Sequence, residues 1–282
     1  MFSFVLIAAA GMVLGAESLT TGEIEEVADG YVFTEGPLWL TEEEKWIFSD
    51  VRADTIYDSN GERHLKPSKN INGLALDKEG RVVACQSGTH SIVRLERNGI
   101  VTVLASEFEG KTLNGTNDLV VRSDGMIFFT DPKAGRDRSG AGLGYAGVYA
   151  LRPETGELRL VTDKMKYPNG IGFSPDEKTL YVSDTSGGGI WSYQVAADGS
   201  ASEGTKLCKV SFPDGLAVDS AGNIWCTSSQ GIVIFSDEGA EFESIKISMM
   251  PTNCAFGGTG KTTLLVTARE KVFRIRTIVS GR

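Results

Sequence analysis

This 282-residue chain has few histidines, no closely spaced cysteine pairs and no net positive charge. Each shortage argues against a class of function. The two histidines lie in polar, turn-like stretches, so a Ser–His–Asp triad has little support. The four cysteines show no CxxC or Cys/His zinc spacing, and their pairing is left open. The net charge is −9, whereas nucleic-acid binding requires a basic surface. We therefore expect no nucleic-acid partner.

Long apolar runs are also absent, except at the N-terminus. Residues 1–16 read MFSFVLIAAAGMVLGA, a run too short to span a bilayer that ends in small residues before Glu17. This pattern predicts a signal peptide, although no lysine or arginine precedes its apolar core. With a working signal peptide the protein would be exported (periplasmic or secreted), and without one it would be cytoplasmic. We expect residues 17–282 to form a single domain with no membrane span.

Sustained helical periodicity is absent as well, and a repeated strand pattern takes its place. Six segments each open with an oxygen-bearing side chain and continue as an apolar strand, a polar turn and a second apolar strand. Further strands follow, for example at 91–104 and 147–161. The spacings between segments are 37, 45, 52, 45 and 39 residues. The opening residues are Glu35, Asn72, Asn117, Asn169, Asp214 and Asn253.

Repeats of four strands, each about 40–50 residues long, are typical of propeller blades. The sequence therefore predicts an all-β fold, a six-bladed β-propeller with four-stranded antiparallel blades around a central metal-binding channel. Residues 23–28 are expected to complete the last blade and close the ring. A β-sandwich is the alternative, but it does not explain six near-copies at this period.

The six opening residues, if structurally equivalent, would meet near the central axis. None is lysine or arginine, and two carboxylates, Glu35 and Asp214, would repel one another unless they were neutralised. A divalent cation resolves that repulsion, and all-oxygen ligation favours Ca²⁺, Mg²⁺ or Mn²⁺ over Zn²⁺. For Asn72 and Asn253 a simple turn residue is the favoured interpretation.

Seven motifs carry a resemblance to a known family. They are TEGPLW (34–39), IFSD (47–50), LNGTND (113–118), FFTDP (128–132), PNGIGFSPDEKTLYVSDT (168–185), PDGLAVDSAGNIW (213–225) and NCAFGG (253–258). Because these motifs occur in this order, the chain resembles the SMP-30/gluconolactonase/LRE family from about Phe33 to Arg276. Members are six-bladed, calcium-dependent propellers that include sugar-lactone lactonases. The resemblance implies metal ligation by Glu35, Asn169 and Asp214, with Asn117 at or beside the metal.

Two departures from the family pattern lie among the expected substrate contacts. Members usually carry an LNSPND-like segment, and animal members have an arginine where this chain has Gly115. The aromatic residue that usually follows FTDP is missing, because DPKAG stands at 131–135. The predicted metal ligands are unaffected by either departure.

The resemblance implies hydrolysis of a sugar lactone to an aldonic acid, with one divalent metal ion. Ca²⁺ is the first candidate, with Mg²⁺, Mn²⁺ or Zn²⁺ as alternatives. Asp214 is predicted to be both ligand and general base. A metal-dependent phosphotriesterase on the same scaffold and a non-catalytic binding propeller with a structural metal are the alternative functions. Substrate contacts are predicted at Asn72, Asn114, Asn117, Asp131 and Asp184. For Asp131 and Asp184 a turn-forming carboxylate is the alternative.

Overall fold

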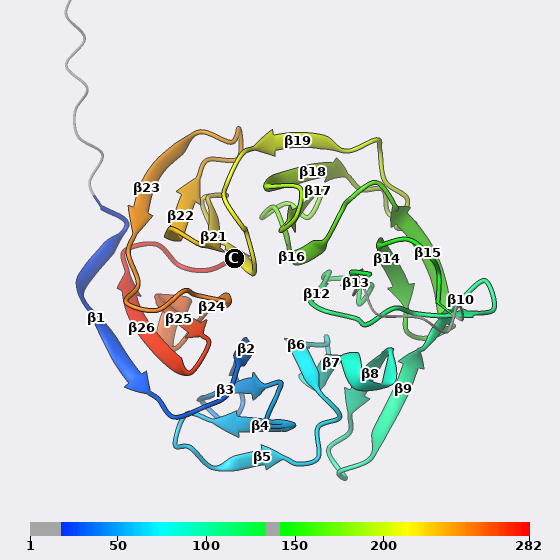
Figure 1. Ribbon diagram of the computed structural model, residues 1–282, viewed down its shortest axis with the longest axis horizontal. Coiled ribbons are helices and arrows are strands. Elements are labelled where there is room, and N and C mark those ends of the chain that lie inside the picture. Colours follow the sequence, from blue (N-terminus) through cyan, green and yellow to red (C-terminus); the bar gives the residue numbers. More distant parts are fainter. Residues whose placement is uncertain (1–17, 134–141) are drawn as a thin grey trace, which may run out of the picture.

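The computed structural model describes residues 18–133 and 142–282, and its strands form a ring of six sheets around a central axis (Figure 1). Each sheet has four strands, and neighbouring strands pair antiparallel. The predicted six-bladed β-propeller with four-stranded blades is confirmed. The predicted signal peptide at 1–16 lies outside the described residues.

Each of the first five blades is built from four consecutive strands, with the first strand innermost. The first blade contains β2 (Thr34–Leu40), β3 (Lys45–Asp50), β4 (Thr55–Asp58) and β5 (Arg63–Leu65). The second contains β6 (Ile71–Leu76), β7 (Val82–Gln86), β8 (Ser91–Leu95) and β9 (Val101–Ala105). The third contains β12 (Leu119–Val121), β13 (Ile127–Asp131), β14 (Gly147–Arg152) and β15 (Glu157–Thr162). The fourth contains β16 (Pro168–Phe173), β17 (Thr179–Asp184), β18 (Gly189–Gln194) and β19 (Thr205–Cys208). The fifth contains β20 (Leu216–Val218), β21 (Ile224–Ser228), β22 (Gly231–Phe235) and β23 (Glu241–Ile245).

The sixth blade joins the two ends of the described chain. It contains β24 (Asn253–Gly257), β25 (Thr263–Ala268), β26 (Lys271–Thr277) and, outermost, β1 (Thr20–Ala28). The predicted closing segment, 23–28, is therefore confirmed and extends back to Thr20. Because β1 pairs with β26, separating it from the ring would break a whole strand ladder.

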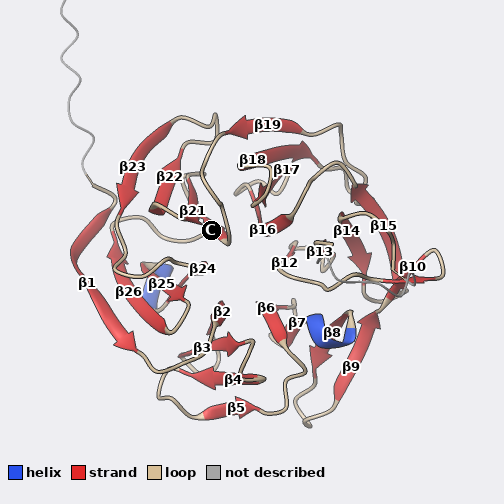
Figure 2. Ribbon diagram, in the orientation of Figure 1, coloured by secondary structure: helices blue, strands red, loops and turns tan. Residues whose placement is uncertain are grey.

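Few other elements interrupt the ring. A small hairpin of β10 (Glu107–Phe108) and β11 (Lys111–Thr112) follows the second blade. Two short 3₁₀ turns, η1 (Ser87–Thr89) and η2 (Thr259–Lys261), are the helical segments of the described chain (Figure 2). No helix among the described residues is long and apolar enough to span a membrane.

Apolar clusters between neighbouring blades form the core. Phe128 and Phe173 pack edge to face between the third and fourth blades, with ring centroids 5.0 Å apart. Trp225 is fully buried and packs against Phe256 between the fifth and sixth. Strand β13 is buried along its whole length because other blades cover both its faces. All four cysteines are unpaired thiols within these packed blades.

The inner strands approach one another so closely that glycine is required beside the axis. The Gly170 N–H donates to the Asp214 carbonyl at 3.1 Å, and a Cβ on Gly170 would lie 2.5 Å from that oxygen. The Gly73 N–H donates in the same way to the Asn117 carbonyl at 2.8 Å. The Asn-Gly and Asp-Gly pairs therefore mark contacts between inner strands.

The turn interpretation favoured for Asn72 and Asn253 is wrong. Asn72 lies within β6, and Asn253 is the first residue of β24. Both side chains stand where inner strands begin, beside the axis, and neither forms a hairpin turn. For Asn72 the physical reason is that the glycine after it provides room for a neighbouring strand, which the sequence pattern alone does not distinguish from a turn; Asn253 is followed by Cys254 and has no such glycine.

Candidate active site

Three carboxyl groups and several amides converge at the axis. Glu35 in β2 is 4% exposed, and Asp118, just before β12, is 7% exposed. The Asn253 Nδ2 lies 3.2 Å from Glu35 Oε2 and 3.2 Å from Asp118 Oδ2, so one amide bridges carboxylates of the first and third blades. Asp214, just before β20, is half-buried and acts electrostatically on Glu35.

These carboxyl groups repel one another in a poorly solvated channel. Burial raises the pKa of Glu35 well above its usual value, and the charges of Asp214 and Asp118 raise it further. Burial, with the Asp118 charge, raises the pKa of Asp214 to about 7. Burial likewise raises the pKa of Asp118 to about 6. Ionisation of all three groups is therefore unfavourable unless bound protons or a cation compensate the charge.

Asp118 was not predicted as a site residue. The residue after the axial position is glycine in four of the six repeats: Gly36, Gly73, Gly170 and Gly215. Asp118 occupies that place in the third repeat, and its Oδ1 fills the space where a Cβ on Gly73 would lie, 2.4 Å away. The signal was the acidic residue at a glycine position, which the repeat alignment contained.

Amide oxygens complete the predicted donor set. Asn72 Oδ1 is buried and has no hydrogen-bond partner among the described residues, an arrangement that costs free energy unless a water or cation meets it. The Asn117 amide also makes no side-chain hydrogen bond within the described chain, while its backbone N–H donates to Thr130 at 2.9 Å. The Asn169 amide contacts Asp214 and donates to Thr185 Oγ1 at 3.1 Å.

This donor chemistry fits a hard divalent cation, because the groups are carboxylates and neutral amide oxygens. No cluster of three or more histidine, cysteine, aspartate or glutamate side chains able to hold a metal is found in residues 18–133 and 142–282. A metal site at the axis would therefore depend on amide oxygens as well as on Glu35 and Asp214.

The predicted substrate contacts at the strand ends are engaged with the protein itself. Asp131 is fully buried and accepts hydrogen bonds from the backbone N–H groups of Asn114 (2.9 Å) and Gly115 (2.8 Å). Asp184 accepts from the backbone N–H groups of Tyr167 at 2.8 Å and Gly187 at 2.9 Å. This arrangement agrees with the alternative of turn-forming carboxylates. Contact between substrate and Asp131, Asp184 or Asn114 stays a prediction.

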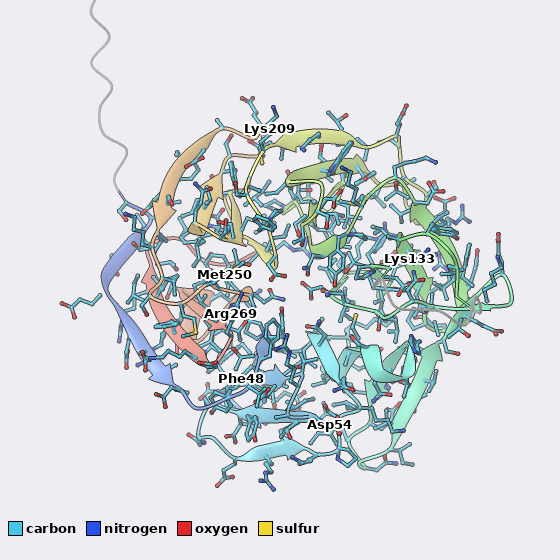
Figure 3. The ribbon with its side chains drawn as sticks, in the orientation of Figure 1. Phe48, Asp54, Lys133, Lys209, Met250 and Arg269 are labelled. Carbon is cyan, nitrogen blue, oxygen red and sulfur yellow. The ribbon has the colours of Figure 1, made fainter. Side chains whose placement is uncertain are left out.

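Arg269 places a positive charge near the carboxylates, from the turn between β25 and β26. Its side chain is exposed, and Figure 3 shows it beside Met250, whose sulfur lies 3.5 Å from the guanidinium. Its backbone carbonyl accepts from the N–H of Thr34, the residue before Glu35. The charge of Arg269 opposes the rise in the pKa of Asp214. The sequence reasoning missed this residue because a lone turn arginine matches no motif.

Comparison with known proteins identifies the family. The sequence profile of the SMP-30/gluconolactonase/LRE-like region matches residues 33–270. The chain belongs to this family. The resemblance predicted from the seven motifs is confirmed.

Relatives at about 30% identity over most of the chain are lactonases. A gluconolactonase from Zymomonas mobilis is 30% identical, with 92% of this chain and 82% of that protein covered. The structure of a gluconolactonase from Xanthomonas campestris matches with a TM-score of 0.83 at 30% identity, over 90% of this chain and 89% of that one. The calcium-binding regucalcin from Agrobacterium tumefaciens has a TM-score of 0.78 at 19% identity, over 93% and 96% of the chains, and so shares the fold.

Proposed function

We propose that this protein hydrolyses a sugar lactone to the corresponding aldonic acid at the axial carboxylate cluster. The observation that carries the proposal is the position of Asp214, half-buried among Glu35, Asn169 and Asp118, in a chain about 30% identical to gluconolactonases. A lactone is small and neutral, so it would meet no charge barrier at a protein with a net charge of −9.

One divalent ion, Ca²⁺ in the first place, would be held by Glu35, Asn117, Asn169 and Asp214. Two carboxylates and neutral amide oxygens form a suitable donor set, and the calcium-binding regucalcin shares the fold. When bound, the ion would polarise the ring carbonyl and favour deprotonation of water.

Asp214 is the group that would take the proton from the attacking water. Its backbone is held on both sides, because its carbonyl accepts from Gly170 N at 3.1 Å and Ser183 Oγ at 2.6 Å, and its N–H donates to Thr227 at 2.8 Å. A pKa of about 7 lies near neutral pH, where a general base is most effective. The fixed backbone keeps the carboxylate aimed into the channel while it changes charge.

The axial amides would orient the substrate. Asn117 and Asn72 present amide groups that lack protein partners within the described residues and can bond to lactone oxygens. Asn169 is held against Asp214 and Thr185, which sets the direction of its remaining polar atoms. Asp131 and Asp184 would act by shaping the loops at 114–115 and 166–167.

The test is a pH-indicator assay of lactone hydrolysis with chelator-treated and metal-restored protein side by side. The panel contains glucono-1,5-lactone, xylonolactone, a γ-lactone and a phosphotriester, with spontaneous ring opening subtracted. We expect metal-dependent turnover of a lactone, and loss of about two or more orders of magnitude in Asp214→Asn. Asp237→Asn, in an exposed turn, is the charge-matched control.

The other outcomes identify the alternatives. Turnover of the phosphotriester alone would replace the lactonase proposal with a phosphotriesterase. If no substrate were turned over and the metal still raised the melting temperature, a binding propeller with a structural metal would be favoured.

A further inference from the structure

A groove of about 400 Å³ opens between the fourth and fifth blades. Its walls are the turn between β17 and β18 (185–188), the segment 209–212 that leads from β19 to Asp214, and Gln230 in the turn between β21 and β22. Figure 3 shows Lys209 at the outer edge of the ring, which marks the outer end of this groove. The volume lies within the range of small-molecule sites.

The inner end of the groove adjoins the axial site. Thr185, one of the lining residues, accepts a hydrogen bond from Asn169 Nδ2 at 3.1 Å and donates one to the Pro213 carbonyl at 2.6 Å. Asn169 and Asp214, the residue after Pro213, are proposed metal ligands. Thr185 therefore connects the lining of the groove to the axial site through two hydrogen bonds.

The groove is lined by polar side chains that have no hydrogen-bond partners among the described residues. They are Ser186, Lys209, Ser211 and Gln230. Together they offer hydroxyl, ammonium and amide groups to a ligand, and the lining contains no carboxylate. This composition suits a ligand rich in hydroxyl groups.

Phe212 adds an aromatic surface to the same groove. Its side chain is 62% exposed, and its backbone has a φ of +49°, a left-handed conformation that is unfavourable for a bulky residue. Exposure of the ring and backbone strain are both costs, and binding would offset them. A sugar ring has C–H groups on its faces and hydroxyl groups around its edge, so it matches an aromatic surface beside polar side chains.

We propose that this groove is a subsite for a second sugar unit, so that the preferred substrate is the lactone of a disaccharide aldonic acid. The proposal rests on the proposed lactonase function, because the lactone ring would occupy the axial site. The second sugar would pack on Phe212 and bond to Gln230 and the groove hydroxyls. Hydrolysis itself adds one water across the ring ester bond and leaves the glycosidic bond intact.

The kinetic test compares cellobionolactone with glucono-1,5-lactone on the metal-loaded enzyme. We expect kcat/KM for the disaccharide lactone to be higher by about tenfold or more, since an extra occupied subsite adds transition-state binding. Phe212→Gly removes the ring and suits the left-handed backbone, and Gln230→Ala alters an exposed turn. Each variant should lower the ratio of the two kcat/KM values several-fold.

The matched control is Phe242→Ala, an aromatic 40% exposed on the outer strand β23, which should leave the ratio unchanged. A wild-type ratio near one, or an equal loss toward both lactones in Phe212→Gly and Gln230→Ala, would overturn the subsite.

A binding measurement distinguishes failure of the subsite from failure of the lactonase proposal. Isothermal titration of cellobionate and gluconate into calcium-loaded protein requires no turnover. Cellobionate should bind about tenfold more tightly than gluconate to the wild type, and this difference should be absent in the groove variants. Tighter cellobionate binding that is lost in Phe212→Gly, without lactone turnover, would support the groove and contradict the lactonase proposal. Gluconolactone turnover with equal binding of the two acids would overturn the groove and leave the lactonase function standing.

Discussion

Lowering the pH from 7 to 5 should weaken calcium binding at the axial cluster by about fiftyfold through the protonation of Asp214. Burial and the Asp118 charge raise the pKa of Asp214 to about 7, so below this pH the metal-free carboxyl group holds a proton. A protonated carboxyl group is a poor ligand, and calcium must displace that proton. Because the group is half-protonated at pH 7 and almost fully protonated at pH 5, this change corresponds to about 2.3 kcal/mol for one proton. The raised pKa of Glu35 adds to the dependence in the same direction.

The assay is titration of Ca²⁺ into chelator-treated protein between pH 5 and 8, in two buffers with different ionisation enthalpies. The difference in measured heat counts the protons released. Asp214→Asn should lower calcium affinity and remove one proton from the count, whereas the exposed Asp237→Asn should change neither. An affinity that is constant between pH 5 and 7, or binding without proton release, would refute the reasoning.

Three further changes test the ring and its charges. Gly170→Ala should destabilise the protein by about 2–3 kcal/mol in urea unfolding, because its methyl group would lie 2.5 Å from the backbone oxygen of Asp214. Gly115→Ala, with no atom within 4 Å, is the control and should change stability by less than about 0.5 kcal/mol. Arg269→Gln should raise the pKa of Asp214 and move the acidic limb of the kcat/KM profile to higher pH; an unmoved limb would contradict the assigned effect. Glu35→Gln should weaken calcium binding and reduce the rise in melting temperature on adding calcium. If this variant kept the activity of the wild type after metal removal, the ligand assignment would be contradicted.

The architecture was predictable because each blade repeats one pattern of side chains around the axis. Six oxygen-bearing residues at near-regular spacing predicted both the number of blades and the residues that begin the inner strands. The closing strand at 23–28 was also placed correctly, because β1 pairs with β26. Repetition supplies this information because equivalent residues of a ring occupy equivalent positions.

Residues that depart from the repeat pattern or lie outside it were missed. Asp118 is a departure from a glycine position, and its importance appears only when Asn253 is seen to bridge it to Glu35. Arg269 lies in a two-residue turn, where any polar residue is ordinary. Asp131 and Asp184 were correctly placed at strand ends, but the sequence could not show that backbone N–H groups already use their oxygens. Such contacts depend on loops whose course no periodicity specifies.

The proposed metal ligands and the residues of the groove lie in different parts of the blades. Bonds between inner strands hold the Asp214 backbone, whereas the groove is formed by turns that branch outward from the blades. A change in a turn can therefore alter which sugar fits without moving the carboxylates. Gln230→Ala should accordingly change the preference for a disaccharide lactone while calcium affinity, measured by the same titration, stays within about twofold of the wild type. A parallel loss of calcium affinity would show that the turns and the axis are coupled, contrary to the hydrogen bonding of the inner strands.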